Sequence, residues 1–225
     1  VDADRLAVVQ AEVQALLQGS TLAGVPVRVV SGSTGQGVAE LQALLFDAAR
    51  QLPPRAAEGA AFRLAVDRAF TLDGVGTVVT GTVHAGRVAV GDELQLVPGT
   101  ARARVRSLHA QNQAVTQAQA GQRTAVALVG LGKDQVTRGQ WLVAPAVALQ
   151  TSRLDVQLTL WQGETKALRS GTPVHVHGGA ADVMGTLAVL DGGESLAPGA
   201  TARVQLVLQQ PVGAWWGDRV VLRDA

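Results

Sequence analysis

The sequence predicts a mainly β protein, in which two consecutive β-barrel domains follow a remnant of an α/β domain. From residue 62 onward, short runs rich in Val, Leu and Thr alternate with glycine-containing turn signals, a pattern typical of barrels and sandwiches. The first 52 residues differ, because two helical repeats flank one β-branched run, as in a parallel α/β sheet. A break that contains Pro145 divides the strands into two groups. We therefore expect domains at residues 1–52, 61–147 and 148–225, with a linker at 53–60.

The composition excludes several classes of protein. Of the 225 residues, 47% are hydrophobic and only 16% are charged, which rules out a disordered chain. The longest apolar run is far shorter than the ~18–20 residues that a membrane-spanning helix needs. The absence of cysteine excludes disulfides, thiolate metal sites and a cysteine nucleophile. No signal peptide is visible, and because the chain opens at Val1 we expect a piece of a longer protein.

The N-terminal segment predicts a helix, a strand, a loop and a second helix. Apolar residues at three- and four-residue spacing follow Asp4, which we expect to cap the first helix, and Gly19 should end it. Residues 25–30 form a β-branched run that fits a buried strand, and residues 38–52 repeat the helical spacing. One strand cannot form a sheet by itself, so we expect this segment to be the end of a larger domain.

The strands of the two β domains are predicted from hydrophobic runs bounded by turn residues such as Asp73-Gly74 and Gly91-Asp92. In the first domain the runs lie near residues 62–70, 75–84, 93–97, 102–108, 123–129 and 140–144. In the second they lie near residues 153–161, 173–178, 183–190, 201–208 and 218–223.

The charge is unevenly distributed along the chain. The net charge is only +1, but it is about −2 for residues 1–60, +4 for residues 61–149 and −1 for residues 150–225. Nearly all basic residues are Arg, which binds carboxylate and phosphate in a bidentate manner. An anionic partner is therefore expected to dock on the first β domain.

Several motifs of the first β domain resemble the second domain of translational GTPases. The resemblance extends over Ala65–Thr82, Val90–Asp92, Ala120–Arg123 and Arg138–Leu142. Within that superfamily, the segment Arg106–Gln113 is similar to the selenocysteine-specific elongation factors of bacteria.

The resemblance implies a function for the full-length protein. It would be a cytoplasmic, monomeric GTPase that uses GTP/GDP and Mg²⁺, binds selenocysteinyl-tRNA and delivers it to the ribosome at recoded UGA codons. The C-terminal domains that bind the messenger hairpin in this family would lie outside the chain. The second barrel, which stops after Val220–Ala225, would lack its last strand.

Three residues are expected to bind the selenocysteine moiety. Asp67, Arg68 and Arg123 match the positions that the resemblance implies for that role. A selenol is more acidic than a thiol, so it arrives as an anion that two guanidinium groups can pair with, whereas the hydroxyl of serine stays neutral. Losing such a partner costs ~3–5 kcal/mol, enough for discrimination of ~10²–10³. Asp67 would orient one arginine or receive the aminoacyl ammonium group.

A structural alternative exists for each of these residues. Asp67 and Arg68 could form a surface ion pair worth ~0–1 kcal/mol, and Arg123 could be a solvated residue at the start of a strand. However, Arg68 shares strand parity with Val66 and Phe70, which predicts that it faces the core.

The glycine-rich loop at residues 31–37 is either a simple connection or a remnant of a nucleotide site. No Gly-Lys-Ser/Thr follows, so it is not a phosphate-binding loop. The resemblance implies that Ser31 and the backbone of Gly32 approach a guanine base. The phosphate, Mg²⁺ and switch motifs of the family are missing, so this fragment is expected to contain no catalytic residue and neither to bind nor to hydrolyse GTP.

Arg102, Arg104 and Arg106 alternate along a predicted strand and should therefore share one face. That face is either solvated or a row of contacts to RNA phosphates.

Other candidate residues are expected to be structural. His175 and His177 share a strand face, but no carboxylate or third histidine has an obvious pairing with them, so we expect no metal site. His109 should form loop hydrogen bonds, while Trp215 and Trp216 should cover the end of the second barrel rather than stack on a base.

Two other functions are compatible with parts of the sequence. A translation factor for ordinary aminoacyl- or initiator tRNA is disfavoured by Arg68 and Arg123. A non-enzymatic β-barrel interaction module is disfavoured by the arginine content of the first β domain and by the guanine-loop remnant.

Overall fold

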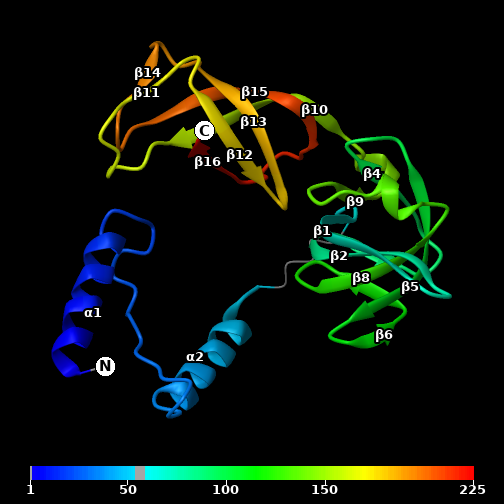
Figure 1. The fold of residues 1–225 in the computed structure, drawn as a ribbon, viewed down its shortest axis with the longest axis horizontal. Helices are drawn as coiled ribbons and strands as arrows, with labels where there is room; N and C mark the ends of the chain where they lie inside the picture. Colours follow the sequence, from blue (N-terminus) through cyan, green and yellow to red (C-terminus); the bar gives the residue numbers. More distant parts are fainter. Residues whose placement is uncertain (1, 54–58) are drawn as a thin grey trace. The chain divides into compact units, whose positions relative to one another are not determined.

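The computed structural model describes residues 2–53 and 59–225 (Figure 1). The chain forms two compact units, which are described separately. One contains residues 2–53 together with Trp161–Thr165, and the other contains the strands that the structure describes. In the part of the chain that the structure describes, no helix is long and apolar enough to cross a membrane.

The N-terminal unit contains two helices, α1 (Ala3–Leu17) and α2 (Val38–Gln51). Both confirm the helical spacing of the sequence, but the expected cap of α1 was wrong. Asp2, not Asp4, is the N-cap, and its carboxylate accepts a hydrogen bond of 2.7 Å from the backbone of Arg5. Asp4 lies inside the first turn, where its charge still favours the helix dipole.

The strand expected at residues 25–30 is not formed. These residues belong to an extended connection between α1 and α2 (Figure 1) and have no strand beside them in the described parts of the chain. An isolated β-branched run cannot satisfy its backbone hydrogen bonds as a strand. Neither helix has a buried residue. Most of the linker predicted at 53–60 lies outside the described residues.

The first large sheet is a closed ring. Its strands follow the order β4-β9-β1-β2-β8-β5-β6; an additional β4–β5 pairing closes the ring, and β6 extends it from β5. A small separate sheet pairs β3 with β7. The strands are β1 (Arg63–Leu72), β2 (Gly76–Ala85), β3 (Arg87–Ala89), β4 (Glu93–Val97), β5 (Arg102–Ala110), β6 (Gln113–Val115), β7 (Gln117–Gln119), β8 (Arg123–Val129) and β9 (Trp141–Val143).

The inside of this ring is a continuous apolar core. Leu64, Val66, Val79, Val126 and Leu142 are completely buried there. Because the strands alternate, the opposite face of most of them is free to carry polar residues. The predicted mainly β class is therefore confirmed, and so are the six predicted strands of this region.

The second large sheet has five strands in the order β10-β15-β13-β12-β16, with a small β11–β14 ladder beside it. Its inner face buries Val174, Val176, Leu187, Val204 and Leu206. All five predicted runs correspond to strands. The strands are β10 (Gln150–Thr159), β11 (Leu168–Arg169), β12 (Pro173–Gly178), β13 (Ala181–Val189), β14 (Ser195–Leu196), β15 (Thr201–Gly213) and β16 (Val220–Asp224). Two short 3₁₀ turns, η1 (Lys133–Gln135) and η2 (Pro145–Val147), lie before β10 in the chain.

The two large sheets meet around the side chain of Trp141, which is only 4% exposed. The guanidinium of Arg63 lies 4.4 Å from the centre of the Trp141 ring and donates hydrogen bonds of 2.8 and 2.6 Å to the two carboxylate oxygens of Asp218. Two glycines make room for the ring, since a Cβ at Gly179 or Gly213 would lie 2.8 Å from it. We call these five residues the junction.

The tryptophan pair of the β15–β16 loop differs from the expectation. The backbone of Trp215 donates a hydrogen bond of 2.8 Å to Asp218, but the residue is 40% exposed, and Trp216 is 95% exposed. Trp216 therefore does not cover the end of the second sheet. Asp218 holds the backbone of the loop at Trp215, and Trp216 is left in solvent.

Candidate functional site

A β-bulge on β1 creates the candidate site. Val66 pairs with Gly81 and Arg68 pairs with Thr80, so the register shifts between them and Asp67 is the extra residue. The bulge directs the Asp67 side chain toward β2 and β8.

The bulge also corrects the expected orientation of Arg68. Strict alternation with Val66 would place Arg68 in the core, but the side chain is exposed, and Ala69 packs against the core instead. One extra residue reverses the phase of the strand, so residues on either side of it follow opposite parities.

Polar contacts converge on the Asp67 carboxylate. Arg123, the first residue of β8, forms a bidentate ion pair with the carboxylate: Nη1 donates to Oδ2, and Nη2 donates to Oδ1 over 3.1 Å. The hydroxyl of Thr80 on β2 donates to Oδ1 over 2.8 Å. The carboxylate is thus held by two neighbouring strands.

These contacts determine the protonation of the pair. Burial by itself would raise the pKa of Asp67, but hydrogen bonds from Arg123 and Thr80, with the charges of Arg123 and Arg68, lower it overall. The hydrogen bond and the charge of Asp67 raise the pKa of Arg123. Asp67 is therefore an anion and Arg123 a cation at neutral pH.

Arg68 gives the site an excess of positive charge. It lies next to Asp67 in the chain and contributes to lowering the pKa of that carboxyl, but among the described residues no carboxylate forms an ion pair with it. The local balance is two guanidinium groups to one carboxylate. The Arg123 side chain is 56% exposed, so its remaining N–H groups are accessible to a ligand.

A groove of about 710 Å³ adjoins Arg123 and Thr80. Its far wall is the turn after β5, where Gln111 and Asn112 have φ angles of +52° and +60°. Two positive φ angles are typical of a type I′ hairpin turn, and Gln is unfavourable there. His109 also lines the groove from β5. It is exposed and makes no side-chain hydrogen bond with the described residues, so the expectation that it supports a loop was wrong.

Sequence reasoning identified the charged residues of this site but missed Thr80, Gln111 and Asn112. No single-sequence signal reveals a bulge, and without it the alignment of Thr80 with Asp67 cannot be inferred. The Gln111-Asn112 turn could have been recognised as a two-residue hairpin connection between hydrophobic runs.

The loop at Ser31 is a compact turn in the N-terminal unit. The Ser31 hydroxyl lies 3.2 Å from that of Ser33 and accepts from the backbone of Thr34 over 3.3 Å. A Cβ on Gly32 would meet no atom within 4 Å, so this backbone is open to a ligand.

The described residues do not fit the phosphate end of a nucleotide. Ser31 and Gly32 offer a hydroxyl and an accessible backbone, which suit the edge of a base. Among the described residues, His175, His177 and Asp182 are the single group of three or more metal-ligating side chains, and they lie in the other unit.

The arginine row on β5 is exposed on one face, as alternation predicts. Arg102 forms an ion pair of 2.9 Å with Glu93, and Arg106 donates to the carbonyl of Val75 over 2.8 Å. Arg104 has no ion-pair partner within the described parts of the chain.

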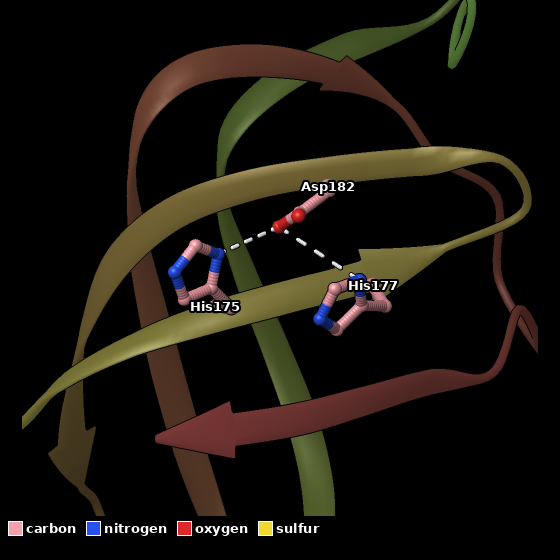
Figure 2. A group of neighbouring side chains, drawn as sticks. All are labelled: His175, His177 and Asp182. Carbon is pink, nitrogen blue, oxygen red and sulfur yellow. Dashed lines mark hydrogen bonds and ion pairs between the residues drawn. The ribbon is translucent and has the colours of Figure 1, made fainter. Parts of the chain in front are cut away.

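The two histidines of β12 have a carboxylate partner that sequence reasoning did not find. Nδ1 of His175 lies 2.8 Å, and Nδ1 of His177 lies 3.8 Å, from Oδ1 of Asp182 on β13 (Figure 2). The statement that no carboxylate pairs with them was wrong, because the β12–β13 hairpin brings together residues that are five and seven positions apart.

Family models match both β regions. Residues 76–143 match elongation factor Tu domain 2, and residues 151–225 match the β-barrel domain of the selenocysteine-specific elongation factor. The chain belongs to the selenocysteine-specific elongation factor family. The match of residues 151–225 is the more specific of the two, although the motifs noticed in the sequence lie mostly in the first β region.

Relatives and solved structures agree with this family. The chain is 38% identical to the selenocysteine-specific elongation factor of Desulfomicrobium baculatum and 37% identical to that of Escherichia coli, in each case over 100% of this chain and 35% or 34% of the relative. It thus spans about a third of these proteins. Elongation factor SelB of Methanococcus maripaludis has a TM-score of 0.85 in its apo form, at 26% identity, covering 99% of this chain and 52% of that one. A structure of the same factor with the GTP analogue GPPNHP has a TM-score of 0.81, at 26% identity, covering 100% and 52%.

Proposed function

We propose that this chain is the aminoacyl-tRNA-binding part of a translation factor that carries selenocysteinyl-tRNA to the ribosome at recoded UGA codons. The observation that carries the proposal is the arrangement at Asp67, where Arg123 is fixed and Arg68 has no ion-pair partner in the described residues. The two relatives are named selenocysteine-specific elongation factors, which supports selenocysteinyl-tRNA as the ligand.

The charge balance favours an anionic side chain. With two guanidinium groups and one carboxylate, the site has one positive charge in excess, and a selenolate would compensate it. A seryl hydroxyl brings no charge, so the arginines would lose solvent without gaining an ionic partner. The preference therefore comes from charge rather than from shape.

Asp67 acts as the positioning residue of this site. Its carboxylate binds the Arg123 guanidinium and is itself fixed by a hydrogen bond from Thr80. The N–H groups of Arg123 that do not bind Asp67 therefore point in a defined direction. Holding the guanidinium in place before the ligand arrives reduces the entropy cost of binding.

The GTPase activity belongs to the full-length parent, which is expected to act in the cytoplasm as a monomer. In this chain, Ser31 and the backbone of Gly32 are the groups that we expect to contact the guanine edge. Bound GTP with Mg²⁺ would supply the phosphoryl group that is hydrolysed, and residues elsewhere in the parent would hold it. Arg104, with Arg102 and Arg106 beside it, is the expected contact to RNA phosphates.

The test is a binding comparison with the full-length protein in its GTP form. Selenocysteinyl-tRNA and seryl-tRNA are prepared on the same tRNA body, and their dissociation constants are measured. We expect the unmodified protein to prefer the selenocysteinyl form by ~10²-fold or more. Arg68→Ala and Arg123→Ala should each remove most of this preference, while Arg68→Lys should retain part of it because the charge remains.

Arg153→Ala serves as the matched control. Arg153 is an exposed arginine on β10 that hydrogen-bonds Gln205 over 3.2 Å, remote in sequence from the site. Its removal should leave the ratio of the two dissociation constants unchanged. Equal affinity of the unmodified protein for both charged tRNAs would refute the proposal.

A further inference from the structure

A cluster of imidazole and carboxylate groups lies on the outer face of the second sheet, apart from the proposed tRNA site. His175 and His177 of β12 and Asp182 of β13 point toward one another (Figure 2). Their ligand atoms all lie within 4.8 Å of one another. The two imidazole rings are nearly parallel, with an interplanar angle of 13° and centroids 6.0 Å apart.

The backbone fixes this arrangement. His177 pairs directly with Asp182 in the β12–β13 register, and the hydrogen bond to His175 runs diagonally across the hairpin. Gly179 is the first of the two turn residues, and its φ of +59° is what a type II′ turn requires. Between the histidines, Val176 points inward and is 4% exposed, so it packs the strand against the apolar core of the second sheet. A slip of the register by one residue would turn both imidazoles into the core.

The donor set is typical of a transition-metal site. Neutral imidazole and carboxylate are ligands for Zn²⁺ and related divalent ions, and three protein ligands leave a position open for water or another ligand. All three side chains are partly accessible, at 28%, 34% and 50% exposure, so an ion can reach them. We propose that His175, His177 and Asp182 bind a divalent transition-metal ion, with at least one coordination position left open.

Only a small rearrangement is needed. Metal–ligand bonds of about 2.0–2.2 Å in a tetrahedral site place the ligand atoms roughly 3.3–3.5 Å apart. Asp182 already lies 2.8 Å from one imidazole nitrogen and 3.8 Å from the other. The ligand atoms, which lie within 4.8 Å of one another, must approach to these separations, and the ion then replaces the direct hydrogen bond between His175 and Asp182.

Arg223 opposes the ion. It pairs with His175 from the other side, on β16, and its charge contributes to lowering the pKa of Asp182, to which the hydrogen bond from His175 contributes most. A guanidinium so close repels a divalent cation and competes for the carboxylate. The affinity is therefore expected to be micromolar rather than the tighter affinity of a closed structural zinc site.

Calorimetric titration of the 225-residue chain with Zn²⁺ in a buffer that does not chelate metals tests the proposal. We expect one site, and a loss of affinity of at least tenfold in each of His175→Gln, His177→Gln and Asp182→Asn. Arg223→Gln should instead increase the affinity by about threefold. This opposite change distinguishes a metal site from a general loss of folding, which far-ultraviolet circular dichroism of each variant also monitors.

Asp191→Asn is the matched control. Asp191 is another partly exposed carboxylate of the same β region, and it pairs with Arg203 at 2.7 Å. Its removal should leave zinc binding unchanged. No binding up to millimolar Zn²⁺, or binding that survives His175→Gln and Asp182→Asn, would overturn the proposal. Neither outcome affects the proposed tRNA site.

Discussion

Two Arg–Asp pairs in this protein have the same chemistry and different surroundings. At the junction, the Arg63 side chain is 8% exposed, lies against Trp141 and donates two hydrogen bonds to Asp218. At the candidate site, Arg123 is 56% exposed and holds Asp67 while Arg68 stands beside them. The Arg63 guanidinium donates two of its N–H groups to Asp218 and is shielded from solvent, whereas the Arg123 guanidinium presents its remaining N–H groups to solvent. Bidentate geometry alone therefore does not indicate function, but accessibility together with an excess charge does.

The largest difference between the pairs should appear in stability. Arg63→Ala leaves a partly buried carboxylate without its partner and removes the contact with Trp141, so we expect the free energy of unfolding to fall by about 3 kcal/mol. Arg123→Ala should cost less than about 1 kcal/mol, because that pair is largely solvated. Urea unfolding followed by tryptophan fluorescence measures both. Similar losses of unfolding free energy in the two variants would show that the exposure of an ion pair does not determine its contribution to stability.

The packing of the junction can be separated from its ion pair through its glycines. Gly179→Ala places a methyl group 2.8 Å from the Trp141 ring and also imposes a side chain on a φ of +59°. We expect a loss of about 2 kcal/mol in the free energy of unfolding.

Gly192→Ala provides the control for this substitution. Gly192 has a similar φ of +68° but nothing within 4 Å of the new methyl group. It should cost only about 1 kcal/mol, which is the backbone strain by itself. If the two variants unfold at the same urea concentration, the contact with Trp141 contributes nothing.

The smallest expected effect is the pH dependence of the site pair. The pKa of Asp67 is lowered on folding, so the stabilisation from its charge is present above the unfolded value of about 3.8 and is lost as the pH falls through the lower folded value. The stability advantage of the unmodified chain over Asp67→Asn should be under about 1 kcal/mol at pH 7 and should shrink below pH 4. In an Arg123→Gln background, most of this pH dependence should disappear. A pH dependence that persists there would be caused by another partner of Asp67.

The sequence predicted the strands far better than their contacts. Hydrophobic runs between glycine turns located all the long strands, because alternation and turn chemistry are local properties. The run at residues 25–30 failed because a strand also needs a neighbour, which local patterns do not report. The Arg63–Asp218 pair joins residues 155 positions apart, and nothing near either of them signals the other.

The candidate site was predictable in its residues but not in its geometry. Asp67, Arg68 and Arg123 were identified through a resemblance, and the structure brings Asp67 and Arg123 together. The orientation of Arg68 was predicted wrongly, since alternation assumes that no residue is inserted into the strand. The partner of His175 was missed for a similar reason, as the register of a hairpin depends on which two residues form its turn.

The bulge on β1 has a consequence for how this strand can change. Val66 and Arg68 lie on opposite faces only because Asp67 adds one residue to the ladder. A deletion elsewhere in the strand that leaves the bulge in place would reverse the faces of all residues on one side of it, which sends either a guanidinium inward or an apolar side chain outward. In this strand length is constrained more strictly than identity: a substitution at Asp67 changes one contact, whereas an insertion or deletion beside the bulge changes which side chains reach the binding surface.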